Sequence, residues 1–517
     1  MYQMGVCSLV YQMIYVLDFG SQYSHLITRR IREFGVYAQL VPPNCSLSKL
    51  KQADGIILSG GPQNLSDSHA LRVDKQIFKL GIPTLGICYG MQLMAFELGG
   101  AVKAGKKREY GPTEIKIVKQ TELFHGLKPK QLTWMSHGDQ VTRLPKGFKM
   151  IAGSSNCPIA AMANETKKIY GLQFHPEVVH TKNGMTILKN FLRITGAKPS
   201  WSMKNFLEKE IEKIKKQVGK EKTVCALSGG VDSAVAAAIV HKAIGKNLIC
   251  VYVDTGLMRE GETQTVVQTF RQYQKITLRV VNAKKEFLAK LKKITDPEKK
   301  RKIIGELFIR IFERETKKLK PKPRFLVQGT LYTDVITSGV SVGGKAALIK
   351  SHHNVGGLPE KLGFKLIEPL RELYKDEVRK IGKLLKLPNA IVHRQPFPGP
   401  GLAVRIIGEV TEWKLEMLKK ADLIVRQEIE KAKINVQQYF AVLPSIKSVG
   451  VQGDARTYGY PIIIRAITTT DFMTAHWAKI PHTVLETISV RITNEVRGVN
   501  RVVYDITSKP PGTVEWE

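Results

Sequence analysis

A cysteine between two glycines is the first feature of the sequence that could perform chemistry. The pentapeptide Gly86-Ile87-Cys88-Tyr89-Gly90 follows an apolar run and precedes a stretch with helical character. Glycines at both ends permit a tight, strained turn from a strand into a helix and leave room for a substrate beside the thiol. A cysteine in such a setting is also a common small core residue, so a catalytic reading requires partners elsewhere in the chain.

Partners for the thiol lie far downstream, in the segment 170–177 of sequence YGLQFHPE. In an extended segment, residues two apart project to the same face, so His175 and Glu177 can lie side by side. A histidine that removes the thiol proton, oriented by a carboxylate, completes a nucleophilic triad. The sequence therefore predicts that Cys88, His175 and Glu177 are catalytic.

These motifs resemble those of the class I glutamine amidotransferases, whose triad signatures are Gly-x-Cys-x-Gly and His-Pro-Glu. The resemblance implies that Cys88 attacks the side-chain amide of glutamine, releases ammonia and leaves a glutamyl thioester for hydrolysis. It extends to the segment 58–62, of sequence LSGGP, as a loop whose backbone N–H groups stabilise the tetrahedral intermediate. The residues implied to bind the oxyanion or glutamine are Gly61, Tyr89, Gln92, Ser136, His137 and Asp139.

A second chemical motif is the segment 228–233, of sequence SGGVDS, which follows the apolar run 223–227 and leads into an alanine-rich helix. Its glycines let backbone N–H groups converge on an anion, its serines add hydroxyl donors, and the helix N-terminus adds a positive dipole end. The motif lacks the Gly-Lys-Ser/Thr of a Walker A loop, which argues against phosphoryl transfer of the P-loop type. The predicted phosphate-binding residues are Ser228, Gly229, Gly230, Val231, Asp232 and Ser233.

This hexapeptide resembles the loop of the N-type ATP pyrophosphatases, which adenylylate a substrate oxygen, release pyrophosphate and let a nucleophile displace AMP. By this resemblance Asp254 contacts ATP, although Thr255 stands where the family usually has Asn or His, and Asp232 contacts Mg²⁺. The segment 349–359, of sequence IKSHHNVGGLP, resembles the lid of GMP synthetases. Its residues implied to neutralise charge on the polyphosphate are Lys350, His352 and His353.

The acceptor of the ammonia is indicated by three segments, 394–403, 449–456 and 500–517, which resemble the C-terminal domain of the GMP synthetases. The resemblance implies that xanthosine monophosphate (XMP), ATP, glutamine and water become GMP, AMP, diphosphate and glutamate through an adenylyl-XMP intermediate. It also implies a homodimer. The residues that it assigns to XMP are Arg301, Gln452, Asp454, Arg501, Lys509 and Glu515.

The elements that must position these residues suggest an α/β chain of three domains. Length alone favours more than one core, since 517 residues exceed the size at which single domains stop growing. Short apolar runs alternate with helical stretches, a linker of sequence GAKPS occupies 196–200, and a Pro/Gly-rich stretch follows residue 394. We expect a flavodoxin-like amidotransferase domain at 12–198, a doubly wound parallel-sheet pyrophosphatase domain at 199–394, and an α+β dimerisation and XMP-binding domain at 395–517.

The bulk composition limits the remaining classes of function. The chain has 43% hydrophobic and 24% charged residues and no apolar run approaching the ~18 residues that a membrane span needs. Its six cysteines form no Cys-x-x-Cys pair, so free thiols and a cytoplasmic location are expected. The net charge of +35 keeps non-specific nucleic-acid binding open, whereas no specific nucleic-acid or membrane partner is expected. An NAD synthetase, which shares the SGGVDS motif, is the other enzyme considered.

Overall fold

The computed structural model describes residues 12–21, 23–334, 363–469 and 474–517. The chain divides into two compact units, Met1–Asn205 and Phe206–Glu517, and each is described by itself. The further separation of the second unit near residue 394 stays a prediction. Among the described helices, none is both long and apolar enough to cross a membrane.

The first unit is built on a nine-stranded mixed sheet in the order β2-β1-β3-β4-β9-β8-β7-β5-β6. Its first five strands are parallel, and they read as nearly continuous apolar runs because helices cover both faces. This order confirms the flavodoxin-like expectation. The parallel strands are β1 (Met13–Leu17), β2 (Tyr37–Val41), β3 (Gly55–Leu58), β4 (Thr84–Ile87) and β9 (Ile169–Leu172).

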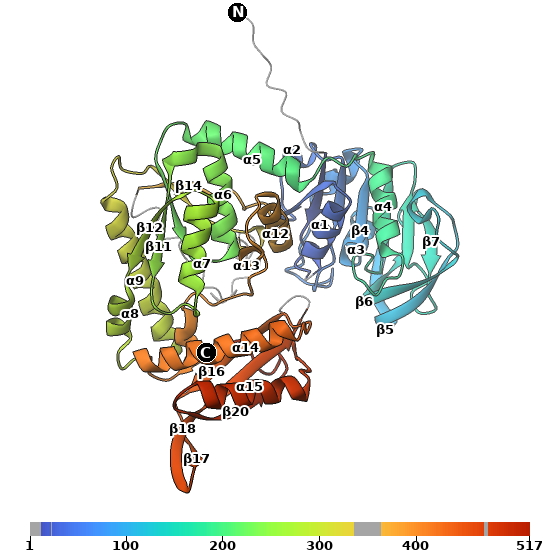
Figure 1. Cartoon of the computed structure of the whole chain (residues 1–517). Helices are drawn as coiled ribbons and strands as arrows, with labels where there is room; N and C mark the ends of the chain where they lie inside the picture. The colour runs from blue at the N-terminus through green and yellow to red at the C-terminus, as the bar shows by residue number, and fades with distance from the viewer. Residues whose placement is uncertain (1–11, 22, 335–362, 470–473) are drawn as a thin grey trace, which may run out of the picture. The chain divides into compact units, whose positions relative to one another are not determined.

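The other four strands extend the sheet in antiparallel fashion, and the long pair of β5 and β6 forms its edge (Figure 1). These strands are β5 (Ala101–Ile117), β6 (Lys130–Arg143), β7 (Lys149–Gly153) and β8 (Ala161–Asn164). The helices of the unit are α1 (Ser24–Glu33), α2 (Leu47–Leu50), α3 (Tyr89–Glu97) and α4 (Gly184–Thr195). Helix α5 (Met203–Val218) begins at the end of this unit and continues into the next.

The second unit begins with a five-stranded parallel sheet in the order β12-β11-β10-β13-β14, as expected for a doubly wound domain. The strands are β10 (Thr223–Leu227), β11 (Leu248–Asp254), β12 (Thr277–Asn282), β13 (Phe325–Val327) and β14 (Lys365–Ile367). The accompanying helices are α6 (Val231–Ile244), α7 (Glu262–Gln268), α8 (Lys284–Leu291), α9 (Pro297–Lys317), α12 (Lys375–Leu384) and α13 (Asn389–Val392).

A six-stranded, largely antiparallel sheet with two helices follows in the same unit. Its strands are β15 (Ile406–Ile407), β16 (Gln438–Pro444), β17 (Ser448–Gln452), β18 (Ala455–Thr468), β19 (His476–Trp477) and β20 (Val499–Asp505), and its helices are α14 (Glu412–Lys431) and α15 (His482–Glu495). The hairpin of β17 and β18 projects from the sheet (Figure 1).

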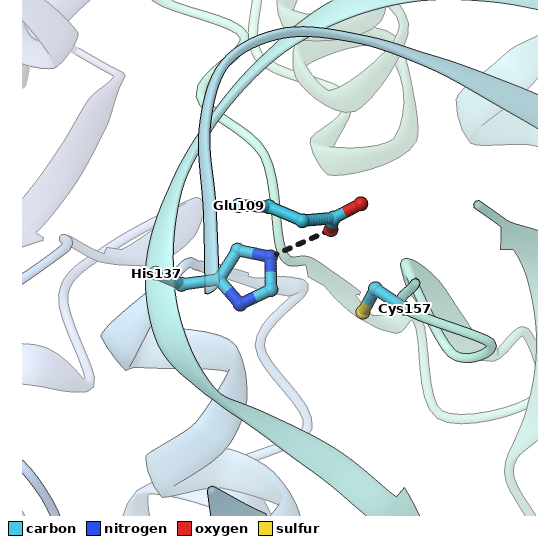
Figure 2. Close-up of side chains that lie close together, drawn as sticks. All are labelled: Glu109, His137 and Cys157. Carbon is cyan, nitrogen blue, oxygen red and sulfur yellow. Dashed lines mark hydrogen bonds and ion pairs between the residues drawn. The ribbon is translucent and has the colours of Figure 1, made fainter. Parts of the chain in front are cut away.

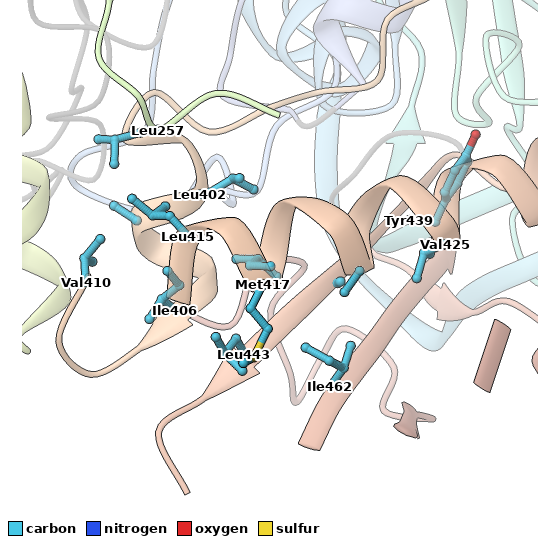
Figure 3. Close-up of a cluster of buried hydrophobic side chains, with 14 of the residues drawn as sticks. Leu257, Leu402, Ile406, Val410, Leu415, Met417, Val425, Tyr439, Leu443 and Ile462 are labelled. Carbon is cyan, nitrogen blue, oxygen red and sulfur yellow. The ribbon is translucent and has the colours of Figure 1, made fainter. Parts of the chain in front are cut away.

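One hydrophobic core joins the two parts of the second unit. Figure 3 shows Leu257, from the loop after β11, beside Leu402 and Leu415, which lead into and begin α14. The same cluster continues through Met417 to Leu443 on β16. The loop that follows β11 is therefore packed against this core, and a well-packed core resists deformation.

Candidate active sites

Cys88 lies on a strained turn between β4 and α3. Its φ of 52° and ψ of −109° are unusual for a residue with a side chain, and they hold the thiol at the carboxyl end of the parallel strands. Both flanking positions must be glycine because backbone carbonyl oxygens approach them too closely for a side chain to fit. A Cβ on Gly90 would lie 2.3 Å from the carbonyl oxygen of Leu58, and one on Gly86 would lie 2.6 Å from that of Gly90.

The predicted histidine and glutamate form a buried pair beside this turn. Nδ1 of His175 lies 2.7 Å from Oε1 of Glu177, and the two residues are 3% and 1% exposed. Gly60 faces both the imidazole and the thiol, since a Cβ there would lie 3.2 Å from Cε1 of His175 and 3.7 Å from Cβ of Cys88. The structure thus brings all three residues of the predicted triad to one place.

The neighbours of His175 favour its protonated form. Burial by itself lowers the pKa of His175, but the Glu177 carboxylate and hydrogen bonds with Cys88 and Glu177 outweigh it and raise that pKa well above its usual value. The ring also packs edge-on against Tyr23, with centroids 5.3 Å apart, and the Thr181 hydroxyl donates to the His175 carbonyl at 2.6 Å. The imidazole therefore has one orientation and a strong affinity for a proton.

The side of the turn toward β6 presents polar groups suited to an amide substrate. The Cys88 thiol lies 3.6 Å from the carbonyl oxygen of Ser136, and Gln92 donates to the carbonyl oxygen of Asp139 at 2.7 Å. Gln92 also donates to the side chain of Gln173, whose amide nitrogen lies 3.7 Å from the Cys88 sulfur. These contacts place three predicted residues around the thiol.

Three other predicted residues have a side chain that points elsewhere or have no side chain. The Tyr89 hydroxyl donates to the Leu71 carbonyl at 2.6 Å, and burial raises the pKa of Tyr89 to about 12, so its side chain belongs to the core. Position 61 has no room for a side chain, since a Cβ on Gly61 would lie 2.8 Å from the Phe19 carbonyl oxygen. The His137 side chain turns toward Glu109 and Cys157 (Figure 2).

The SGGVDS segment forms the turn between β10 and α6. Gly229 has a φ of 76°, and the two serine hydroxyls of the segment lie 3.1 Å apart, with that of Ser228 accepting from the Gly230 N–H at 3.3 Å. The Ser233 hydroxyl donates to the Gly230 carbonyl at 3.1 Å. The loop is therefore folded around its own hydroxyls at a helix N-terminus, as an anion site requires.

Two carboxylates lie near this loop. Oδ2 of Asp232 pairs with Lys375 at 2.5 Å, while its buried Oδ1 has no hydrogen-bond partner within the described parts of the chain. Asp254, at the end of β11, accepts from the Gly256 N–H at 3.0 Å and pairs with Lys284 at 3.4 Å. The orphaned oxygen of Asp232 is the feature that suits a Mg²⁺ ion, which prefers oxygen ligands.

The residues assigned to XMP fall into two groups. Arg301 donates to the Glu517 main-chain oxygen at 2.5 Å, Glu515 accepts two bonds from the buried Arg405, and Lys509 pairs its main chain with Ala475. In the other group, Gln452 ends β17, Asp454 lies in the exposed turn of the β17–β18 hairpin, and Arg501 on the adjacent β20 lies 3.4 Å from Ser448 at the base of that hairpin. The chain places one group at its C-terminal segment and the other on the projecting hairpin.

Relatives match almost the whole of this chain. A GMP synthase [glutamine-hydrolyzing] of Geobacillus kaustophilus (strain HTA426) is 57% identical over 98% of this chain and 99% of its own length. Another, of Carboxydothermus hydrogenoformans, is 57% identical with the same coverage. The chain belongs to the glutamine-hydrolysing GMP synthases. It is accordingly a carbon–nitrogen ligase that takes its nitrogen from glutamine and uses ATP and XMP as substrates.

Family models account for the parts of this GMP synthase. Residues 15–195 match glutamine amidotransferase class-I, residues 201–310 match NAD synthase, and residues 427–516 match the GMP synthase C terminal domain. The NAD synthase match covers the shared pyrophosphatase fold around the SGGVDS loop. The C-terminal match excludes an NAD synthetase as the identity of the whole chain.

Solved structures also resemble a part of this chain. A protein from Thermoplasma acidophilum that is described as one subunit of a GMP synthase is 32% identical over 40% of this chain and 98% of its own, with a TM-score of 0.33. A glutamine amidotransferase from Thermotoga maritima is 22% identical over 37% of this chain and 87% of its own, with a TM-score of 0.30.

Sequence reasoning missed two residues of these GMP synthase sites. Gln173 lies two positions before His175, and the same alternation that paired His175 with Glu177 could have found it. Arg394 donates to the Gly229 carbonyl and pairs with Glu262 at 2.5 Å, which fixes the phosphate loop from a distant segment. The predicted lid residues Lys350, His352 and His353 lie outside the described residues.

Proposed function

We propose that Cys88, His175 and Glu177 perform the glutaminase half of the GMP synthase reaction. His175 takes the proton of the Cys88 thiol, the thiolate attacks the side-chain carbonyl carbon of glutamine, and backbone N–H groups of Gly61 and Tyr89 stabilise the oxyanion. His175 passes its proton to the departing nitrogen, so ammonia leaves and a thioester remains. His175 then accepts a proton from water, which attacks the thioester and releases glutamate. The buried pair of His175 and Glu177 beside the thiol is the observation that carries this assignment.

The second half of the reaction belongs to the loop between β10 and α6. We infer that its N–H groups and hydroxyls bind the phosphates of ATP while the purine 2-oxygen of XMP attacks the α-phosphorus and diphosphate leaves. Ammonia then attacks the purine C2, and AMP departs with the former 2-oxygen. Asp232 would hold Mg²⁺, which would neutralise charge on the diphosphate. Asp254 borders the nucleotide, and the lid residues Lys350, His352 and His353 complete the proposed set.

The XMP site is proposed to need a second copy of the chain. The predicted contacts of Gln452 and Asp454 stand on a hairpin that projects from the sheet, whereas Arg301 and Glu515 lie with the C-terminal segment. One face of this hairpin exposes Val449, Val451 and Tyr458 by 48%, 78% and 66%. Exposed apolar side chains in one patch are typical of an interface. A homodimer would cover them and bring a hairpin to a partner's site.

The Cys88→Ala variant tests the division of labour. We expect it to lose glutamine-dependent GMP formation by a factor of roughly 1000 or more, since no other nucleophile is in place. GMP formation from ammonium chloride, XMP, ATP and Mg²⁺ should persist, because the second unit needs only free ammonia. Cys45→Ala, which removes a partly exposed free thiol, is the matched control and should retain both activities. Loss of the ammonia-dependent reaction in Cys88→Ala, with Cys45→Ala intact, would contradict the assignment.

A further inference from the structure

A buried network connects the glutaminase site to the edge pair of strands in the first unit. Glu109 on β5 and His137 on β6 are register partners, so their side chains project from the same face of the sheet. Both side chains are 3% exposed, and Oε2 of Glu109 lies 3.1 Å from Nε2 of His137 (Figure 2). Neither residue is part of the proposed triad, yet a buried charge of this kind is costly unless it is paired.

The hydrogen bonds around His137 determine where its protons are. Nδ1 of His137 lies 3.0 Å from the Asp139 carbonyl oxygen, which can only accept, so Nδ1 carries a hydrogen. Nε2 faces a carboxylate oxygen, which also accepts unless it is protonated. The other oxygen, Oε1 of Glu109, already accepts from the Ser154 hydroxyl at 3.0 Å. One more proton must therefore lie between Nε2 of His137 and Oε2 of Glu109, whichever atom holds it.

The same network reaches the nucleophile. The Asp139 carbonyl that accepts from His137 also accepts from Gln92 at 2.7 Å, and Gln92 bonds to Gln173 at 3.2 Å. Gln173 in turn lies 3.7 Å from the Cys88 sulfur. A displacement of the Asp139 carbonyl would move the polar groups that surround the thiol.

We infer that Glu109 and His137 share one buried proton and together position the glutamine-binding side of the glutaminase site. The inference rests on the proposed glutaminase function, and it makes both residues positioning residues that touch neither substrate nor the reacting atoms. Loss of the contact between Glu109 and His137 would remove the side-chain hydrogen bond that joins β5 to β6 at this point. The Asp139 carbonyl and Gln92 would then lose the geometry that an amide substrate needs.

A metal ion is the competing occupant of this cluster. The ligand atoms of Glu109, His137 and Cys157 lie within 4.8 Å of one another, a set of types that zinc accepts. The thiol of Cys157, however, donates to the Ile159 carbonyl at 3.5 Å, and burial together with Glu109 raises its pKa to about 12. A neutral thiol engaged elsewhere is a poor metal ligand, whereas the proton already accounts for the contact of Glu109 with His137.

Other charged or titratable groups lie on the elements around the pair. Cys157, from the loop after β7, interacts electrostatically with both Glu109 and Cys88, and with its raised pKa it remains a neutral thiol over the working range of pH. Arg108, beside Glu109 on β5, has its side chain 3.8 Å from where a Cβ on Gly138 would be.

Glutaminase kinetics of the full-length chain test the inference through two substitutions. Glu109→Ala removes the acceptor and should raise the KM for glutamine by about tenfold or more, because a buried hydrogen bond to a charged group is lost. Glu109→Gln can accept from Ser154 and donate to Nε2 of His137, so it should restore the KM at neutral pH without a shared proton.

Three measurements complete the design. Ammonia-dependent GMP formation should be unchanged in every variant, which reports that the second unit has folded, and a retained kcat of the glutaminase reaction reports the same for the first unit. Cys157→Ser is the matched control and should leave KM unchanged, and wild-type protein analysed for metal should contain no stoichiometric zinc. An unchanged KM in Glu109→Ala, a Glu109→Gln variant no better than Glu109→Ala, or zinc lost in Cys157→Ser would overturn the inference. Retained glutaminase activity in Cys88→Ala would instead overturn the proposed site itself.

Discussion

Among single residues, the glutaminase site depends on how burial and charge compete around one imidazole. Burial favours a neutral His175, whereas the Glu177 carboxylate 2.7 Å away and the neighbouring Cys88 favour its protonated form. The attraction to these groups outweighs the effect of burial because the carboxylate contacts the ring directly in a site that water does not screen. The same competition at Cys157 has the opposite outcome, because its neighbour Glu109 repels a thiolate and adds to the effect of burial.

Glu177→Gln should reduce the free energy of unfolding by an amount that depends on pH. Because the folded-state pKa of His175 is raised, its stabilising contribution is fully present below the unfolded value near 6.5 and is lost as pH rises through the raised folded value. We expect a difference of about 1–3 kcal/mol at pH 6 that shrinks toward alkaline pH. Urea denaturation from pH 6 to 10 measures it.

The control for this prediction is an exposed ion pair of the same unit. Glu114 lies 3.0 Å from Lys130 with both side chains more than half exposed, so Glu114→Gln should change stability by less than about 0.5 kcal/mol at every pH. A loss in Glu177→Gln that is constant across the pH range would show that His175 does not carry the effect.

Among the secondary-structure elements, the site depends on one turn between a strand and a helix. The carbonyl oxygen of Leu58 on β3 approaches Gly90 so closely that no side chain fits, and the Ser59 carbonyl accepts from the Gly90 N–H at 3.0 Å. The turn is thus packed against the neighbouring strand and hydrogen-bonded to the residue that follows it. These contacts hold the backbone of Cys88 at its strained φ. Helix α3 begins directly after the nucleophile and fixes its direction.

Gly90→Ala should displace this turn. A methyl group 2.3 Å from the Leu58 oxygen forces β3 and α3 apart, at a cost of about 1–3 kcal/mol or more in the stability of the first unit. We expect a lower melting temperature and loss of most glutamine-dependent activity. Ammonia-dependent synthesis should be retained below the new melting temperature. Glutaminase activity equal to that of wild type would show that the turn tolerates the shift.

The sequence predicted the parts of this site that local pattern controls. Glycines around Cys88 indicated the turn, and the spacing of two residues placed His175 beside Glu177, as found. The register of β5 and β6 could not be predicted in this way, because an irregularity between Ala104 and Glu109 shifts the pairing. The contact of Glu109 with His137 follows from that register, so no local sequence pattern predicted it.

Across the chain as a whole, the second unit is held together by its C-terminal segment. The buried Lys300 of α9 donates to the Glu517 carboxylate at 2.6 Å and to the Ile406 carbonyl at 2.7 Å. Arg405 makes two bonds to Glu515, and Arg465 donates to the Thr513 carbonyl. Buried cations of this kind leave a large penalty when their partners are removed, so the segment is fixed against the parallel-sheet part of the unit.

The proposed association of two chains can be tested by one substitution. Val451 is 78% exposed and shares a hairpin face with Val449 and Tyr458, so a partner that covers this face would bury all three. Val451→Asp should raise the dimer dissociation constant by about 100-fold or more, because an unpaired carboxylate would be desolvated in an apolar contact. Val118→Asp, which changes an exposed valine of the first unit, should leave that dissociation constant unchanged.

Sedimentation at several protein concentrations gives the dimer dissociation constant, and XMP titrations give the affinity for XMP. If Val451→Asp sediments as the wild type does, the hairpin is not the interface; if it becomes monomeric with XMP affinity intact, each chain holds XMP alone.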